Sequence, residues 1–399
     1  MKYCHLFLLS VILSLPAVSC KRDNLLSNNV ANASVQLKTL VAASEQGTVT
    51  LIPSTFKNGQ IVFVPKDDWV SGFFAGTLWE MYALTGDAYW AEHAARQTEN
   101  IDTIKNLKWH HDIGFMIGDS FGAGLLYGQD KIDVKAYQEV MVEAARSLAT
   151  RFRPGAGIIQ SWNVDRSWQV ERGWRCPVII DNMMNLELLF KASEISGDQS
   201  FRNMAISHAD VTMANHFRPD YSCFHVVDYD PGTGEVRRRC TAQGFSDESA
   251  WARGQAWALY GYTMVYKYTK DEKYLDWAKH IFDFIYTNPN MPEDLVPYWD
   301  YDCPDIPNTP RDVSSAAIMA SASYDLYCLT GETEYRGMAD KTLKSLSLPA
   351  YRAARGENGG FILMHSVGSI PHGNNIDVPL NYADYYFLEA LLKRKALED

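Results

Sequence analysis

The 399-residue sequence lacks the features that would mark a nucleic-acid-binding protein or a zinc protein. It carries a formal charge of -11 and no block rich in Lys or Arg, whereas phosphate binding needs a basic face. No two of its 7 Cys form a CxxC pair, so no zinc site of that kind is expected. Nucleic acid is therefore excluded as a partner, and an acidic ligand would need local positive groups.

The N-terminal apolar run is too short for the roughly 20 residues that a membrane-spanning helix needs. Lys2 precedes the apolar run 6–15, small residues then lead to Cys20, and this pattern is typical of a signal peptide with a bacterial lipobox. We expect a signal peptide over 1–19, a lipidated Cys20 with a linker over 20–34, and an exported periplasmic or cell-envelope lipoprotein held at the inner or outer membrane only by its lipid. Simple cleavage and secretion is the alternative.

Disulfide bonds have little support in the spacing of the remaining Cys. Five follow the lipobox, namely Cys176, Cys223, Cys240, Cys303 and Cys328. The odd number leaves at least one thiol unpaired, and only Cys223 with Cys240 forms a plausible bridge.

Apolar and aromatic residues are abundant and evenly distributed. Hydrophobic residues make up 47% of the chain, and 11 Trp with 22 Tyr suggest sugar-stacking surfaces as well as core packing. Because composition does not change along the chain, we expect one large domain over 35–399.

A helical run that stops at a short Gly/Asp turn and then restarts recurs along this domain. Gly just past a helix, followed by a capping Asp or Thr, is typical of a tight turn between two helices. The five turns lie within 82–89, 126–130, 193–201, 266–274 and 327–335. A last run over 382–392 can supply a sixth inner helix, and an early helix near 31–46 can close the ring. The pattern predicts an all-α protein, an (α/α)6 barrel of six helical hairpins.

The inner helices of this barrel should begin with polar or aromatic groups that meet at one mouth. These starts are Asp68-Trp69, His111-Asp112, Asp181-Asn182, Arg253 and Asp312. Helix N-termini also favour anions. The segment 224–239 alternates in the β sense around Asp-Pro-Gly-Thr-Gly and predicts a hairpin at the rim, which would bring His225 and Gln243 to the site.

Two carboxylates are candidates for acid–base chemistry. Asp181 follows an apolar run and starts an apolar helix, so burial should raise its pKa, as a catalytic acid needs; the alternative is that it only caps its helix. Asp112 has a similar position, and two nearby carboxylates can hold each other's pKa values apart. His110 and His111 could ligate a metal, but no spaced partner motif accompanies them, so no metal centre is expected.

Arg253 and Trp257 are four residues apart and lie on one helix face. This pair offers a guanidinium for a sugar carboxylate beside an indole for the sugar ring. A surface Arg over a core Trp is the alternative. Trp69, Trp162 and Trp168 are further stacking candidates.

Four sequence motifs together resemble those of the unsaturated glucuronyl hydrolases, glycoside hydrolase family 88. They are 69–76, 111–115, 181–185 and 253–257, and the likeness runs from about residue 35 to the end. The resemblance implies a six-hairpin (α/α)6 barrel without metal or organic cofactor. It also implies a substrate that carries a 4,5-unsaturated uronic acid at its non-reducing end, as polysaccharide lyases produce.

The same resemblance implies residue roles and a reaction. Asp181 is similar to the family's general acid and base and Asp112 to its carboxylate partner, while Trp69, His225, Gln243, Arg253 and Trp257 are similar to the residues that hold the sugar. Hydration of the vinyl ether double bond would then release the saccharide without a covalent glycosyl-enzyme, unlike ordinary glycoside hydrolysis.

The C-terminal phrase 361–372 also resembles the family and would place Ser366 and Ser369 near the second sugar and its sulfate. Some members have a basic residue close behind these serines, but this chain has Pro371 and His372. The sulfate preference therefore stays undecided.

Two other functions remain as alternatives. An unsaturated rhamnogalacturonyl hydrolase would run the same hydration on pectin fragments. A non-catalytic lipoprotein would only capture acidic oligosaccharides at its aromatic mouth. The phrases around Asp112 and Arg253 favour the glucuronyl enzymes by analogy.

Overall fold

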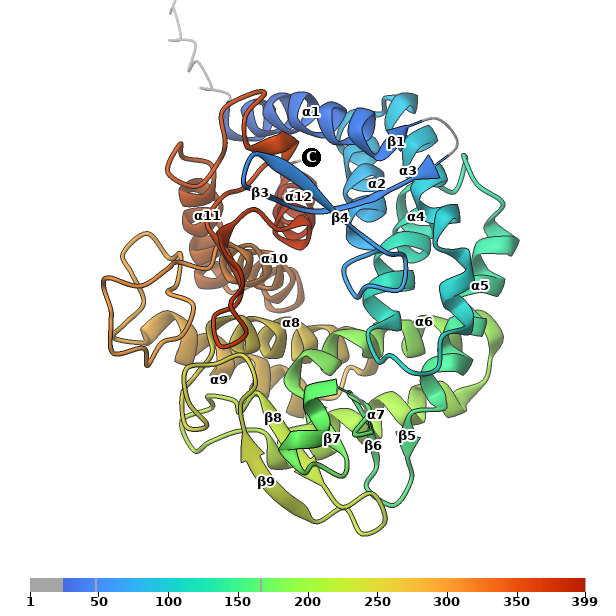
Figure 1. Ribbon diagram of the computed structural model, residues 1–399, viewed down its shortest axis with the longest axis vertical. Helices are drawn as coiled ribbons and strands as arrows, with labels where there is room; N and C mark the ends of the chain where they lie inside the picture. Colours follow the sequence, from blue (N-terminus) through green and yellow to red (C-terminus); the bar gives the residue numbers. More distant parts are fainter. Residues whose placement is uncertain (1–23, 47–48, 166, 399) are drawn as a thin grey trace, which may run out of the picture.

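Twelve α-helices occur in the residues that the computed structural model describes, which are 24–46, 49–165 and 167–398. They alternate along the chain between an outer and an inner position and form two concentric rings (Figure 1). The ring closes where α12 (Asn381–Ala396) packs against α2 (Phe73–Thr85). The predicted (α/α)6 barrel is confirmed.

The two rings consist of the even-numbered and the odd-numbered helices. The inner helices are α2, α4 (Ala123–Tyr127), α6 (Leu186–Ser196), α8 (Ala252–Thr269), α10 (Val313–Thr330) and α12. A π-helix, η2 (Gly114–Gly122), leads into α4, and a 3-10 helix, η4 (Ile180–Asn185), leads into α6. The outer helices are α1 (Asn24–Ser44), α3 (Ala88–Asn100), α5 (Val134–Ala149), α7 (Gln199–Asn215), α9 (Glu272–Thr287) and α11 (Thr333–Leu346).

Burial distinguishes the rings. In α8 every residue from Ala252 to Val265 is buried, so this helix is surrounded by protein. In α9 the buried residues recur every three or four positions, as in Tyr274, Ala278, Ile281 and Ile285. This spacing is that of a surface helix with one apolar face.

The turns between inner and following outer helices use the chemistry that the sequence indicated. Gly86 ends α2 in the left-handed conformation, with φ of 68°, and Asp87 caps α3 by accepting the amide of Tyr89. The second turn differs from the expectation. There the cap of α5 is Asp133, three residues beyond the expected Asp130.

The longer connections precede the inner helices and carry the strands, so the strands gather at the mouth. Antiparallel hairpins are formed by β3 (Ile52–Lys57) with β4 (Gln60–Val64), and by β10 (Ser366–Ser369) with β11 (Asn374–Val378). The predicted rim hairpin is confirmed as β8 (Val226–Tyr229) with β9 (Val236–Cys240), and β7 (Pro177–Ile179) adds a third strand. Smaller pairs are β1 (Glu45–Gln46) with β2 (Val49–Thr50), and β5 (Phe152–Arg153) with β6 (Ile158–Ile159).

Helix α1 starts earlier than the sequence suggested, because residues 24–34, expected to belong to a linker, are helical. Polar side chains fix this part of the helix. The Asn29 amide donates to Ser347 Oγ at 2.7 Å, the Asn32 amide to the Ala353 carbonyl at 3.0 Å, and the Gln36 amide to the Phe361 carbonyl at 2.8 Å. An Asn-rich segment without an apolar stripe therefore resembles a linker in sequence while it packs as a helix.

All five Cys from Cys176 onward are free thiols, so the plausible Cys223–Cys240 bridge is not formed. Cys223 packs in the main barrel core and Cys240 in a separate cluster with Trp174.

The expected signal peptide and Cys20 lie outside the described residues. Among the described helices, none combines the length and apolarity that crossing a membrane would require.

Candidate active site

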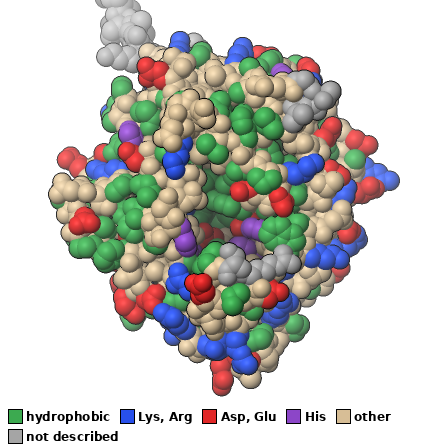
Figure 2. Space-filling view, in the orientation of Figure 1, with side chains coloured by type: hydrophobic (Ala, Val, Ile, Leu, Met, Phe, Trp, Pro, Cys, Tyr) green, Lys and Arg blue, Asp and Glu red, His purple; other side chains and the backbone are tan. Residues whose placement is uncertain are grey.

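Three adjoining chambers open at the mouth, where Figure 2 shows a hollow bordered by hydrophobic, acidic and His side chains. The inner chamber has a volume of about 130 Å³ and the outer one about 480 Å³. The third, of about 250 Å³, shares Trp69, Gln243 and Arg253 with the inner chamber and Ser369 with the outer one. The inner chamber is lined by Trp69, His110, Asp112, Phe115, Trp162, Ile179, Asp181, Gln243 and Arg253. Six of the residues predicted to bind, stack on or transform substrate therefore share one chamber, namely Trp69, Asp112, Trp162, Asp181, Gln243 and Arg253.

Asp181 lies where strand β7 turns into η4, and it is 9% exposed. Burial raises the pKa of its carboxyl to about 6, although the nearby Arg253 guanidinium limits the rise. Its side chain does not cap the helix, and its Oδ2 atom has no hydrogen-bond partner in the described structure. The carboxyl is thus buried, has a pKa within about one unit of neutral pH, and is free to exchange a proton.

His225 faces this free oxygen. Its Nδ1 atom accepts the backbone N–H groups of Ala242 at 3.1 Å and Gln243 at 3.2 Å. Burial keeps the pKa of His225 well below its usual value, so the ring is neutral and carries its hydrogen on Nε2. That atom is 3.8 Å from Asp181 Oδ2 and has no partner among the described residues.

Asp112 precedes η2 and is also buried. Its Oδ1 atom accepts the side-chain amide of Asn185 at 3.1 Å, and His111 Nε2 lies 3.2 Å away from the same oxygen. Burial raises the pKa of Asp112 to about 8; the Asn185 hydrogen bond opposes this shift, and the Asp181 charge adds to it. At neutral pH, Asp112 therefore keeps its proton while Asp181 is largely ionised.

Arg253, the second residue of α8, is 2% exposed and strongly held. Its guanidinium donates to Asp312 Oδ2 at 3.0 Å and to the carbonyls of Val367 and Gly368. It lies over the rings of Trp251 at 4.5 Å and Tyr382 at 5.5 Å. Arg253 is thus a buried cation in the wall of the inner chamber, held by its ion pair with Asp312.

Trp257 differs from the sugar-stacking plate that the sequence suggested. It is 0% exposed and packs against Phe115 and Tyr386 at ring-centroid distances of 5.2 and 5.4 Å. Its indole N–H is close enough to the Asp181 carboxyl to lower the pKa of that group. The contact does not have the geometry of a hydrogen bond, so the N–H has no hydrogen-bond partner among the described residues. Trp257 thus lies next to the Asp181 carboxyl, within the core.

The other predicted residues occupy different parts of the mouth. Trp69 and Gln243 line all three chambers, and Ser369 lines the outer one, where its Oγ contacts His372 Nδ1 at 2.7 Å. Trp168 also lines the outer chamber. Ser366 does not belong with them, because it is fully buried in β10 and borders none of the three chambers.

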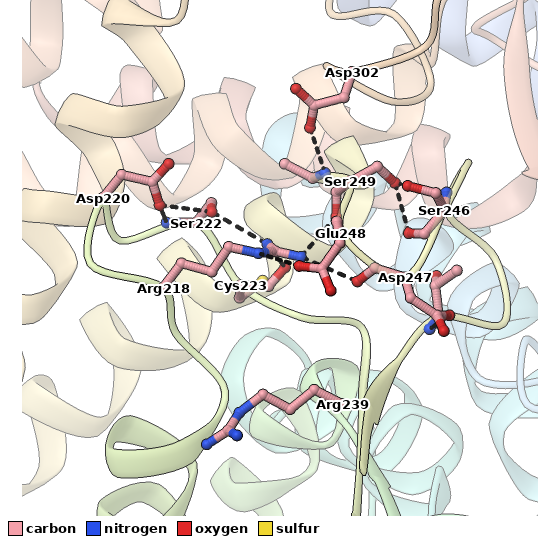
Figure 3. Close-up of polar contacts among 12 residues, drawn as sticks. Arg218, Asp220, Ser222, Cys223, Arg239, Ser246, Asp247, Glu248, Ser249 and Asp302 are labelled. Carbon is pink, nitrogen blue, oxygen red and sulfur yellow. Dashed lines mark hydrogen bonds and ion pairs between the residues drawn. The ribbon is translucent and has the colours of Figure 1, made fainter.

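Arg218 bonds to the loop before β8 and to the loop after β9 (Figure 3). The first of these loops carries His225 and the second carries Gln243. Arg218 donates to the Cys223 carbonyl at 3.2 Å in the loop before β8, and to the Asp247 carbonyl at 3.2 Å and the Ser249 carbonyl at 3.3 Å in the loop after β9. Asp302 accepts the amide of Ala250 at 2.7 Å. These contacts preorganise the site before any ligand binds.

Sequence reasoning missed two supporting residues. Asn185, four residues after Asp181, joins the carboxylate segments because it donates to Asp112 and accepts the amide of Phe115 at 3.2 Å. Arg151 donates to the carbonyls of Lys108 and Ser161, both at 3.0 Å, and lowers the pKa of Asp112. The four-residue spacing from Asp181 could have revealed Asn185, but nothing in the sequence indicated Arg151.

One group in the described part of the chain could hold a metal ion. The potential ligand atoms of His110, His111 and Asp112 lie within 4.8 Å of one another. The imidazole rings are parallel, with centroids 5.2 Å apart. Burial lowers the pKa of His110 to about 4 and that of His111 well below its usual value, so both rings are neutral and able to bind a transition metal.

An (α/α)6 barrel with two buried carboxyls in a chamber lined by Trp, His, Gln and Arg defines a glycoside hydrolase. The family model "Glycosyl Hydrolase Family 88" matches residues 49–265. An unsaturated glucuronyl hydrolase of Formosa agariphila is 46% identical over 334 residues, covering 84% of this chain and 82% of that one. The chain belongs to glycoside hydrolase family 88.

Solved structures are similar over nearly the whole chain. The crystal structure of an unsaturated glucuronyl hydrolase specific for heparin has a TM-score of 0.88 and 43% identity, covering 94% of this chain and 98% of that one. An Asp-to-Asn mutant of the Streptococcus agalactiae enzyme complexed with dGlcA-GalNAc6S has a TM-score of 0.76 and 29% identity, covering 92% and 91%.

Proposed function

We propose that this chain is an unsaturated glucuronyl hydrolase that removes the 4,5-unsaturated uronic acid from the non-reducing end of glycosaminoglycan fragments made by lyases. The heparin specificity of one relative and the dGlcA-GalNAc6S ligand of another support this substrate class. The observation that carries the proposal is the unpartnered Oδ2 atom of Asp181, buried in a chamber with the Arg253 guanidinium.

The reaction begins with protonation of the double bond. Arg253 and Gln243 bind the polar groups of the unsaturated ring, and Trp69 packs along it. Protonated Asp181 delivers its proton to C4, and positive charge develops at C5 and the ring oxygen. The neighbouring carboxylate that forms on Asp181 stabilises this charge.

Water then adds at C5. Asp181, now ionised, removes a proton from the attacking water, while the Nε2–H of His225 hydrogen-bonds its oxygen. Protonated Asp112 donates a hydrogen bond to the ring. The resulting hemiketal opens and releases the rest of the saccharide, so Asp181 is regenerated without a covalent glycosyl-enzyme.

The test follows the ultraviolet absorbance of unsaturated disaccharides from chondroitin, hyaluronan, heparin and pectin lyases. Wild-type protein should remove the chromophore of glycosaminoglycan disaccharides, and Asp181→Asn should be slower by about 10² to 10⁴ while it still binds them. Activity on the pectin product alone would favour the rhamnogalacturonyl alternative. Binding without turnover by wild type would favour the capture protein.

We also propose that the protein is exported and anchored through acylated Cys20. The lipobox-like sequence supports this, and α1 begins at Asn24, so the anchor would hold the barrel close to the membrane surface. Fractionation tests it. The wild type should follow membranes and incorporate a fatty-acid label, whereas Cys20→Ser should do neither.

A further inference from the structure

The outer chamber is too large to serve only one sugar ring. Its volume of about 480 Å³ is several times the 130 Å³ of the inner chamber. Trp69, His110, Trp162 and Gln243 line both chambers and mark their junction. A disaccharide would occupy the inner chamber with either this junction or the third chamber, which shares Trp69, Gln243 and Arg253 with the inner one. In both cases the outer part of the larger chamber is left for a further ring.

Trp109 lies in that outer part, and its side chain packs little against the rest of the protein. It lines the outer chamber only, and it is 42% exposed. Within the described chain its ring contact is the edge of His110, at a centroid distance of 5.2 Å. By contrast, Trp162 packs against Trp168 at 5.1 Å and Trp174 at 5.5 Å. An exposed indole at the rim of a sugar site is a surface on which a pyranose can stack.

An exposed positive charge lies beside two aromatic residues at the edge of the same chamber. Arg172 ends the 3-10 helix η3 (Ser167–Arg172) and lies over the rings of Trp168 at 5.6 Å and Trp174 at 5.5 Å. It forms no ion pair with any described residue, and its guanidinium donates to the Thr241 carbonyl at 3.4 Å. The pKa of His372, a lining residue of the chamber, is lowered first by burial and then by the Arg172 charge. An anionic group in the outer chamber would therefore be favoured here.

We propose that Trp109 and Arg172 form a subsite for the third sugar ring of the substrate, an acidic sugar, so that the enzyme prefers unsaturated tetrasaccharides to disaccharides. Trp109 supplies the stacking surface, and Arg172 attracts the carboxylate or sulfate of that ring. The inference rests on the proposed function, because it assumes that an unsaturated uronic acid occupies the inner chamber.

The experiment compares kcat/KM for a defined unsaturated disaccharide and the tetrasaccharide of the same polymer. Trp109→Ala should lower kcat/KM for the tetrasaccharide about tenfold and leave the disaccharide within about twofold. Trp109→Phe should keep part of the preference. Phe245→Ala is the matched control, since Phe245 is an aromatic 48% exposed that lines neither chamber.

Arg172→Gln provides an independent measurement. It should lower kcat/KM for the tetrasaccharide and flatten its dependence on salt concentration, because exposed charges act through screened electrostatics. Equal wild-type rates on both lengths, or an equal loss on both lengths in Trp109→Ala, would overturn the subsite while leaving the proposed function intact. No turnover of either substrate by wild type would overturn the proposed function itself.

Discussion

The Nε2 atom of His225 faces Oδ2 of Asp181 at 3.8 Å, and neither atom has another hydrogen-bond partner in the described structure. This distance is too long for a direct hydrogen bond. Two neighbouring buried polar atoms without partners are a cost to the fold, which a bound water or substrate atom between them would remove.

His225 should therefore matter for turnover more than for binding. Its loss removes the N–H that faces Asp181 and leaves the amides of Ala242 and Gln243 without their acceptor. We expect His225→Ala to lower kcat by about 10². Steady-state kinetics on an unsaturated disaccharide measure this change in kcat and, beside it, the KM. His225→Gln keeps an acceptor and a donor and should retain more activity; equal activity in wild type and His225→Ala would show that the relationship is only structural.

The pH profile should reflect the pKa of Asp181. Asp181 must be protonated to act as the acid, so kcat/KM should fall tenfold for each pH unit above about 6. Because Arg253 lowers this pKa, Arg253→Met should move the falling limb to higher pH, besides raising KM. The control is Arg175→Met. Arg175 is 60% exposed and pairs with Asp230, so its replacement should not move the falling limb of the pH profile. An unchanged limb in Arg253→Met would contradict the assignment.

The barrel was predictable because its signals are local. Gly and Asp at the hairpin turns, such as Gly86 and Asp87, define helix ends through backbone geometry that neighbouring residues alone determine. The sequence predicted too late a start for helix α1, because its first turns are held by polar contacts with residues hundreds of positions away. Such contacts leave no periodic pattern in the sequence.

The site was predictable as a set of residues, but less so in the placement of each one. Asp112, Asp181 and Arg253 meet because each lies at the start of a helical segment that forms or leads into an inner helix. Trp257 shares a helix face with Arg253, yet one turn further along α8 it already lies in the fully buried core. Spacing gives the face of a helix but not the depth at which the chamber ends.

The group of His110, His111 and Asp112 leads to a prediction about metals. No step of the proposed reaction uses a metal, so dialysis against a chelator should leave kcat unchanged. Added Zn²⁺ should inhibit reversibly, since its ligands would include Asp112 and two neutral imidazoles at the substrate chamber. His110→Ala should weaken Zn²⁺ binding measured by calorimetry. Loss of activity on chelation with recovery on adding metal would require a metal in the mechanism.

The buried carboxyls should make the protein less stable at higher pH. The pKa of Asp112 is raised from 3.8 to about 8 and that of Asp384 from 3.8 to about 7, in both cases mainly by burial. Between pH 3.8 and each raised pKa, the folded state holds a proton that the unfolded chain has released. The free energy of unfolding therefore falls as pH rises through this interval. Thermal unfolding should therefore occur several degrees lower at about pH 8 than at about pH 5.

Replacement of Asp112 separates this effect from general changes with pH. Asp112→Asn cannot ionise, so the folded state no longer loses a bound proton there, and the difference between the two melting temperatures should shrink. Asp276→Asn is the control, since Asp276 is exposed on outer helix α9 and its replacement should leave the difference as in wild type. If Asp112→Asn unfolds with the same pH dependence as wild type, Asp112 is ionised in the folded protein at neutral pH. It could then not donate the hydrogen bond assigned to it during hydration.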